Sequence, residues 1–136
     1  MPKKILCATD GSAHSEQAVA FAARLAKSTD ATLIYLAVEP FALDRAGPWP
    51  LWADGEAAEK LDSATRIAEK MGVTTVNRIE AQAVDVADAI LTCAAKADAD
   101  LVVVGSRGRG PIQRLLGGSI SNQVLNKARV PVTVVH

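Results

Sequence analysis

Residues 101–119 of the chain read LVVVGSRGRGPIQRLLGGS. The four apolar residues at 101–104 form a continuous run, which is typical of a parallel strand covered by helices on both faces. The run ends at Gly105, where a loop with several glycines begins. This pattern predicts a buried strand in an α/β fold, followed by a loop beyond the carboxyl end of the sheet.

Strand and helix patterns alternate on both sides of this stretch. Strand patterns lie at 5–8, 32–38, 73–80, 101–104 and 130–135, and helix patterns lie at 13–28, 56–71, 84–97 and 119–128. Strands separated by helices pair in parallel through right-handed crossovers. The chain is therefore predicted to form one domain, 1–136, with a Rossmann-like, open, doubly wound sheet of five parallel strands and helices on both faces. If the first and fourth strands flank one crevice, the strand order is 3-2-1-4-5.

Local signals refine this outline. Ser12 is expected to cap the first helix, and Gly72 is expected to end the second. The mixed polarity of 73–80 predicts a strand at the edge of the sheet. Residues 39–55 break the alternation with three prolines, two glycines and both tryptophans, so a long loop is expected there. Its tryptophans are consistent with covering a ligand base or with packing in the core or at an interface, and packing is the favoured interpretation.

The overall charge excludes some classes of partner. Fifteen basic residues balance fifteen acidic ones, so no global field attracts nucleic acid or an anionic membrane. No apolar run approaches the roughly 20 residues that a membrane span needs, and no secretory signal is evident near the start. We therefore expect a cytoplasmic protein. The two cysteines form no CxxC pair and are expected to be buried thiols.

Open α/β sheets bind ligands beyond the carboxyl ends of their strands. Two ends carry suggestive residues, namely 9–12 after the first strand and 105–108 after the fourth. Glycines allow backbone N–H groups to approach an anion, and residues 117–121 begin a helix whose first N–H groups can do the same. Between 105 and 118 there are three arginines and no acid. A solvated turn, with Asp10 as a simple turn residue, is the competing interpretation.

The spacing of this loop resembles that of a known family. Gly105, Gly108, Gly118 and Ser119 follow the pattern G-x2-G-x9-G-S, which is similar to the ATP-binding branch of the universal stress protein family. The opening ILCATDGS and the closing PVTVV extend the resemblance over nearly the whole chain. It implies an adenine nucleotide alpha hydrolase-like fold. Two departures are Ala8, where the family usually has proline, and the entry to the third helix at 83–86, which lacks the common Gly-x-Pro.

The resemblance also implies a set of nucleotide-binding residues. These are Ala8, Asp10, Val38, Gly105, Arg107, Gly108, Gly118, Ser119, Ile120 and Ser121. Asp10 is expected to contact the nucleoside, Val38 the adenine, and the glycines and serines the ribose and phosphates. The ligand is expected to be ATP, ADP or AMP, with Mg²⁺ held through the phosphates. Arg107 has a long side chain and is the least firmly assigned of the set.

Three functions stay open at this point. The favoured one is a nucleotide-binding regulatory module that senses ATP in a stress response. The second is a slow ATPase or self-phosphorylating protein with Ser119 or Ser121 as acceptor, although no general base is evident. The third is a dimeric interaction protein that binds no nucleotide. The resemblance implies a homodimer paired through the apolar last strand, with Val130, Val132 and Val134 at the interface.

Overall fold

The computed structural model describes residues 1–106 and 120–136. Helices and strands alternate along the chain as the sequence predicts, except that two strands, β2 and β3, follow each other. Their bounds are β1 Lys4–Ala8, α1 Ala13–Thr29, β2 Thr32–Asp44, β3 Gly47–Pro50, α2 Glu56–Lys70, β4 Val76–Ala83, α3 Val86–Lys96, β5 Leu101–Gly105, α5 Ile120–Lys127 and β6 Val132–Val135.

The parallel sheet has the predicted strand order. β1 pairs with β2 and β5, β2 pairs with β4, and β5 pairs with β6, all in parallel. The order β4-β2-β1-β5-β6 is the expected 3-2-1-4-5 when the predicted strands are numbered along the chain. Within the described part of the chain, β4 and β6 are the two edges of this parallel sheet. The strand expected at 130–135 begins two residues later, so Val130 precedes it.

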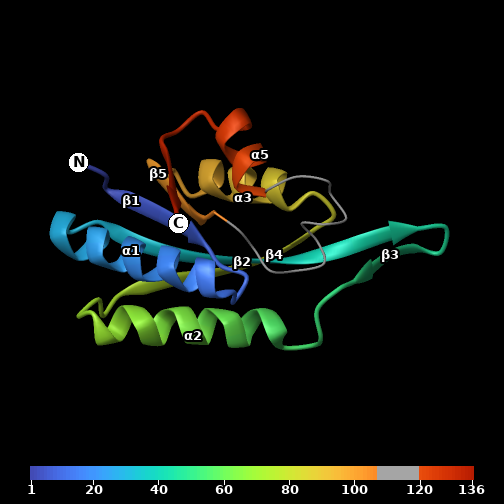
Figure 1. Cartoon of the computed structure of the whole chain (residues 1–136), viewed down its shortest axis with the longest axis horizontal. Helices are drawn as coiled ribbons and strands as arrows, with labels where there is room; N and C mark the ends of the chain where they lie inside the picture. Colours follow the sequence, from blue (N-terminus) through green and yellow to red (C-terminus); the bar gives the residue numbers. More distant parts are fainter. Residues whose placement is uncertain (107–119) are drawn as a thin grey trace.

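Helices cover both faces of the sheet (Figure 1). α1 and α2 lie on one face, and α3 and α5 lie on the other. Each face has its own core cluster: Tyr35 and Leu61 are buried in the first, and Leu6 and Ile90 in the second. Alternate residues of each strand point to opposite faces, so strands such as β5 are apolar throughout. The doubly wound architecture is confirmed.

The loop expected at 39–55 is wrong for most of its length. β2 continues to Asp44 and forms an antiparallel hairpin with β3, which projects away from the rest of the sheet (Figure 1). Asp44 Oδ1 accepts the Ala46 N–H at 2.8 Å, and Gly47 closes the turn with a φ of 105°. Proline usually argues against a strand, but β3 lies at an edge, where a missing N–H breaks no ladder bond. The sheet of the described residues therefore has a sixth, antiparallel strand.

The expected helix ends are confirmed. Ser12 Oγ accepts the Ser15 N–H at 3.1 Å and caps α1. Gly72 follows α2 with a φ of 88°, a backbone conformation that glycine adopts without a Cβ clash. These caps fix where α1 begins, directly after the end of β1, and that position shapes the site described next.

Candidate functional site

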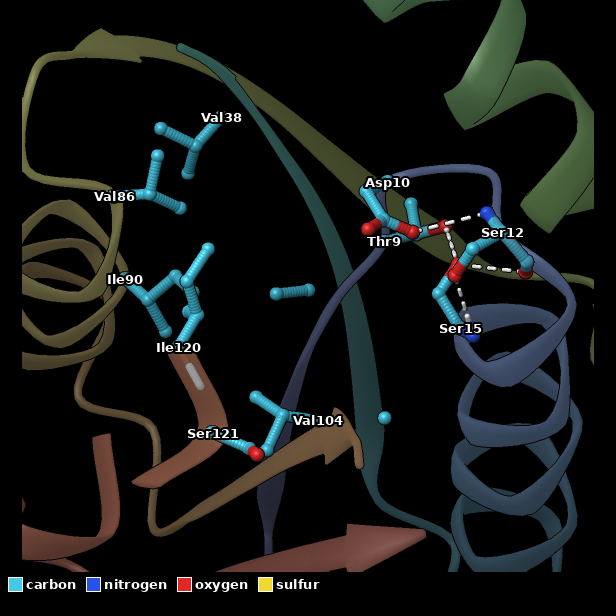
Figure 2. A pocket seen from close by; sticks show the side chains of 12 residues that line it. Thr9, Asp10, Ser12, Ser15, Val38, Val86, Ile90, Val104, Ile120 and Ser121 are labelled. Atoms are coloured by element: carbon cyan, nitrogen blue, oxygen red, sulfur yellow. Dashed lines mark hydrogen bonds between the residues drawn. The ribbon is translucent and has the colours of Figure 1, made fainter. Parts of the chain in front are cut away.

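A cleft lies beyond the carboxyl ends of β1 and β5, between α1 on one side and α3 and α5 on the other (Figure 2). The chain runs from β1 to one edge of the sheet and from β5 to the other, so the cleft is at the topological switch point. Six of the residues predicted from the sequence line it: Ala8, Asp10, Val38, Gly105, Ile120 and Ser121. The other four, Arg107, Gly108, Gly118 and Ser119, lie outside the described residues.

The cleft also has lining residues that the sequence analysis did not select. They are Thr9, Ser12, Ser15, Val86, Ile90 and Val104. Val86 and Ile90 were expected to face the core, and they do. Their spacing of four residues at the start of α3, which begins at the carboxyl edge of the sheet, could have marked them as lining residues. Thr9 lies in the stretch 9–12 that follows the first strand, whereas Ser15 carries no comparable signal, because its place depends on how α1 packs.

The wall formed by the β1–α1 turn is polar, and its hydroxyl groups are bonded to one another. Thr9 Oγ1 and Ser15 Oγ are buried and lie 2.9 Å apart. Ser15 Oγ donates to the Ser12 carbonyl at 3.2 Å. A hydroxyl has one hydrogen, so Thr9 is the donor to Ser15 when Ser15 donates to the Ser12 carbonyl. Thr9 Oγ1 also accepts the Gly11 N–H at 3.3 Å. This chain of bonds holds the turn against the first turn of α1.

Asp10 is exposed at the end of this wall, and one of its carboxylate oxygens stabilises the turn. Its Oδ1 accepts the Ser12 N–H at 2.9 Å. The interpretation of Asp10 as a turn residue is therefore right for that oxygen. Among residues 1–106 and 120–136, Oδ2 makes no hydrogen bond. A carboxylate has about four acceptor sites, so Asp10 can hold the turn and still accept hydrogen bonds from a ligand.

Gly105, at the end of β5, is explained by close packing. A Cβ atom there would lie 2.8 Å from the His14 carbonyl oxygen and 3.1 Å from the Ser15 backbone nitrogen. Its φ is not in the left-handed region, unlike that of Gly11. The absence of a side chain therefore lets β5 meet the backbone of α1. Nearby, Ser121 Oγ donates to the Ser106 carbonyl at 3.3 Å and ties the start of α5 to the end of β5.

The opposite wall is apolar. Figure 2 shows Val38, Val86, Ile90 and Ile120 gathered across the cleft from the hydroxyl groups of the β1–α1 turn, with Ser121 on their own side. Val38 comes from the end of β2, the next two from α3, and Ile120 from α5. The cleft thus pairs an apolar surface, suited to a flat ring, with a surface of hydroxyl and carboxylate oxygens. Small ligands with both an apolar and a polar part fit such a site.

The cysteine and histidine side chains of the described residues form no second site of this kind for a ligand. Burial raises the pKa of the Cys7 thiol, and Cys93 is half-buried with a raised pKa for the same reason. His14 is half-buried, and its Nδ1 has no hydrogen-bond partner among the described residues. Over the same residues, no group of three or more His, Cys, Asp and Glu side chains could hold a metal ion. No described helix is long and apolar enough to cross a membrane.

Comparison with known proteins adds an independent finding. The profile of the universal stress protein family matches residues 1–136. A universal stress protein of Methanocaldococcus jannaschii is 36% identical over 142 residues, which cover 98% of this chain and 81% of that protein. One of Thermus aquaticus is 37% identical over 140 residues and the full length of both chains. A universal stress protein crystallised in complex with cAMP has a TM-score of 0.78, 27% identity, and coverage of 99% and 97%.

Proposed function

The chain belongs to the universal stress protein family, and we propose that its cleft binds an adenine nucleotide. The observation that carries the proposal is the pairing of an apolar and a polar wall at the switch point of the sheet. The apolar wall suits the adenine ring, and the polar wall suits ribose and phosphate. The similar protein in complex with cAMP supports this class of ligand.

The proposed ligand is ATP, ADP or AMP, bound within a single domain, 1–136. In this proposal Ala8 and Val38 lie near the base, and Asp10 accepts hydrogen bonds from ribose hydroxyls. Gly105 and the backbone N–H groups of Ile120 and Ser121 adjoin the phosphates, because the first N–H groups of a helix attract anions. Arg107, Gly108, Gly118 and Ser119 complete the ATP-binding motif, with Mg²⁺ held through the phosphates.

The first test is to identify the molecule that copurifies with the protein, by mass spectrometry after denaturation. Calorimetric titration with ATP, ADP, AMP and cAMP then ranks the candidates. We expect at least one adenine nucleotide to bind in the micromolar range or tighter and GTP to bind more weakly. No heat of binding with any adenine nucleotide at millimolar concentration contradicts the proposal.

We propose a regulatory role, in which a cytoplasmic protein senses the nucleotide during stress, in preference to catalysis. Asp10 is the sole ionisable side chain among the described lining residues, and the Thr9 and Ser15 hydroxyls are already engaged with each other. A general base needs a side chain within reach of the attacking group. A single-turnover assay with labelled ATP distinguishes the alternatives: we expect intact ATP after hours with Mg²⁺, whereas labelled protein or released phosphate indicates self-phosphorylation or hydrolysis.

We also propose that the protein is a homodimer that pairs through β6. The Val102 N–H donates to the Pro131 carbonyl, and the Ser106 N–H donates to the Val135 carbonyl. In a parallel strand the N–H and C=O of one residue point to the same side, and successive residues alternate. The backbone groups of Val132 and Val134 therefore point to the outer edge, where a second copy can pair with them. Val130, just before β6, extends the same edge.

Two proline substitutions test this dimer. Val134→Pro removes an outward N–H, which an edge strand tolerates, so we expect a folded monomer by analytical ultracentrifugation. Thr133→Pro removes an N–H that points toward β5, so we expect loss of stability. A dimer that persists in Val134→Pro contradicts pairing through β6.

A further inference from the structure

Lys60, on the second turn of α2, lies against the turn that follows β1. Its Nζ would be 3.1 Å from a Cβ atom built on Gly11, and its Cγ would be 3.3 Å from that atom. Gly11 has a φ of 80° and lies between Asp10 and the cap residue Ser12. The lysine side chain is 18% exposed. Lys60 therefore packs directly on the backbone of the turn that bears Asp10.

Two groups hold the Lys60 ammonium from the other side. Glu56 Oε2 lies 3.0 Å from Nζ, and the Trp52 ring centroid lies 4.6 Å from it. Glu56 is itself fixed, because its Oε1 accepts the Ala53 N–H at 3.0 Å. That hydrogen bond lowers the pKa of Glu56, and the ion pair with Lys60 acts in the same direction. The ammonium is thus placed between the turn and the segment that joins the hairpin to α2.

Lys60 and the cleft lie on opposite sides of the β1–α1 turn. A second hollow lies between α1 and α2, and Thr9, Gly11 and Lys60 are among its lining residues. Thr9 also lines the first cleft, so the two hollows share a wall. Among the described residues, the lining of the first cleft contains no basic side chain. Lys60 is the cation directly behind its polar wall.

We propose that Lys60 is a positioning residue that couples occupancy of the cleft to Trp52 and the base of the β2–β3 hairpin. This inference rests on the proposed binding of an adenine nucleotide. A ligand hydroxyl that binds Asp10 changes the contacts of the turn against which Lys60 packs. The negative charge of the nucleotide in the cleft attracts the ammonium, which shifts the position of the ammonium between Glu56 and Trp52. An isolated exposed ion pair on a helix would have no such link to the cleft.

Trp52 provides a direct readout, because the chain has only two tryptophans. Trp49 is exposed on the hairpin, and its Nε1 donates to Asp44 Oδ2. In the Trp49→Phe variant, Trp52 alone emits, so we expect its emission to change when AMP or ATP binds. In Trp49→Phe/Lys60→Met, we expect binding that is about five-fold weaker, in the range of coupling between neighbouring sites, and loss of most of the emission change.

Three further variants make the test specific. Lys70→Met removes the same charge from the exposed last turn of α2, and we expect wild-type affinity and an unchanged emission response. Lys60→Arg keeps the cation and is expected to restore both. Trp52→Phe, which leaves Trp49 alone, is expected to abolish the response while binding persists.

The outcomes separate this inference from the proposed function. If calorimetry shows nucleotide binding but Trp52 emission does not change, or if Lys60→Met binds as tightly as Lys70→Met, the inference is overturned and the proposed function stands. If the wild type binds no adenine nucleotide, both are overturned. A thermal melt of each variant identifies any loss of affinity that comes from unfolding.

Discussion

The ends of β1 and β5 border the same cleft, but they leave the sheet in different ways. β1 passes into a turn whose polar side chains bond to one another, with Thr9, Asp10 and Ser12 each accepting a backbone N–H. β5 ends in Gly105, which meets the backbone of α1 at a distance that leaves no room for a side chain. One end is held by hydrogen bonds, and the other by close contact.

The difference shows that a residue at a candidate binding site can be required for two separate reasons. Gly105 borders the cleft, yet packing against His14 and Ser15 is sufficient to require glycine there. Asp10 also has a structural bond, but one of its oxygens is left for a ligand. Substitutions at the β5 end should therefore act mainly on stability, and substitutions at Asp10 mainly on binding.

Gly105→Ala is expected to have the largest effect on the free energy of unfolding. The added methyl group would lie 2.8 Å from the His14 carbonyl oxygen, so β5 or α1 must move. We expect a loss of about 2–3 kcal/mol in the free energy of unfolding, as for other overpacked sites, measured by urea denaturation. Gly55→Ala is the control, because Gly55 has a φ of 80° but no atom within 4 Å of its Cβ position. It should cost about 1 kcal/mol from backbone strain alone. Equal losses in the two variants contradict the packing argument.

Thr9→Val should have the next largest effect. The substitution keeps the shape of the side chain but removes the hydroxyl that bonds Ser15 and Gly11. We expect a loss of about 1–2 kcal/mol, since buried partners are left unpaired, with a lower midpoint in the same denaturation experiment. Thr9→Ser keeps the hydroxyl and should retain most of the stability. A Val variant as stable as the Ser variant would show that the hydroxyl chain does not hold the turn.

Ser12→Ala should cost less. Ser12 Oγ accepts the Ser15 N–H and caps α1, and loss of such a cap typically costs about 1 kcal/mol. Ser12→Asp supplies another good capping oxygen and is expected to restore stability. Hydrogen exchange of the first-turn amides of α1 provides the local measurement, with faster exchange in Ser12→Ala alone. Unchanged exchange there is evidence against the cap.

Asp10→Asn should have the smallest effect on stability and a clear effect on binding. The asparagine carbonyl can still accept the Ser12 N–H, so we expect a change of less than about 0.5 kcal/mol in the free energy of unfolding. The loss of a charged acceptor should weaken adenine nucleotide binding about ten-fold, which is the usual scale for a hydrogen bond to a charged group. Calorimetry measures the affinity. Wild-type affinity in this variant means that Asp10 is a turn residue only.

The sequence predicted the fold well where strand and helix patterns were repeated along the chain. Five strand patterns separated by helix patterns predicted the parallel sheet, and the residues at the ends of the first and fourth strands predicted the order β4-β2-β1-β5-β6. The hairpin was missed because Pro48 and Pro50 normally argue against strands. They are compatible with β3 because, among the described residues, β3 pairs only with β2, so the other side of the strand needs no N–H groups.

The sequence also predicted part of the candidate site, where local patterns mark the ends of strands and the starts of helices. Asp10, Gly105 and Ser121 were found from the residues that follow strands and begin helices, and they do line one cleft. Ser15 and Val104 were missed because each lies inside a regular element, where its own residue type is expected for a helix or a buried strand. Their role as lining residues depends on how α1 and β5 meet.

Local patterns thus established the order of elements, the caps at Ser12 and Gly72, and the end of the sheet at which a ligand would bind. These features depend on residues close together in the chain. The packing reason for Gly105 and the contact of Lys60 with Gly11 became visible only when distant segments were assembled. Such contacts join backbone and side chains far apart in sequence, and no spacing along the chain encodes their distances.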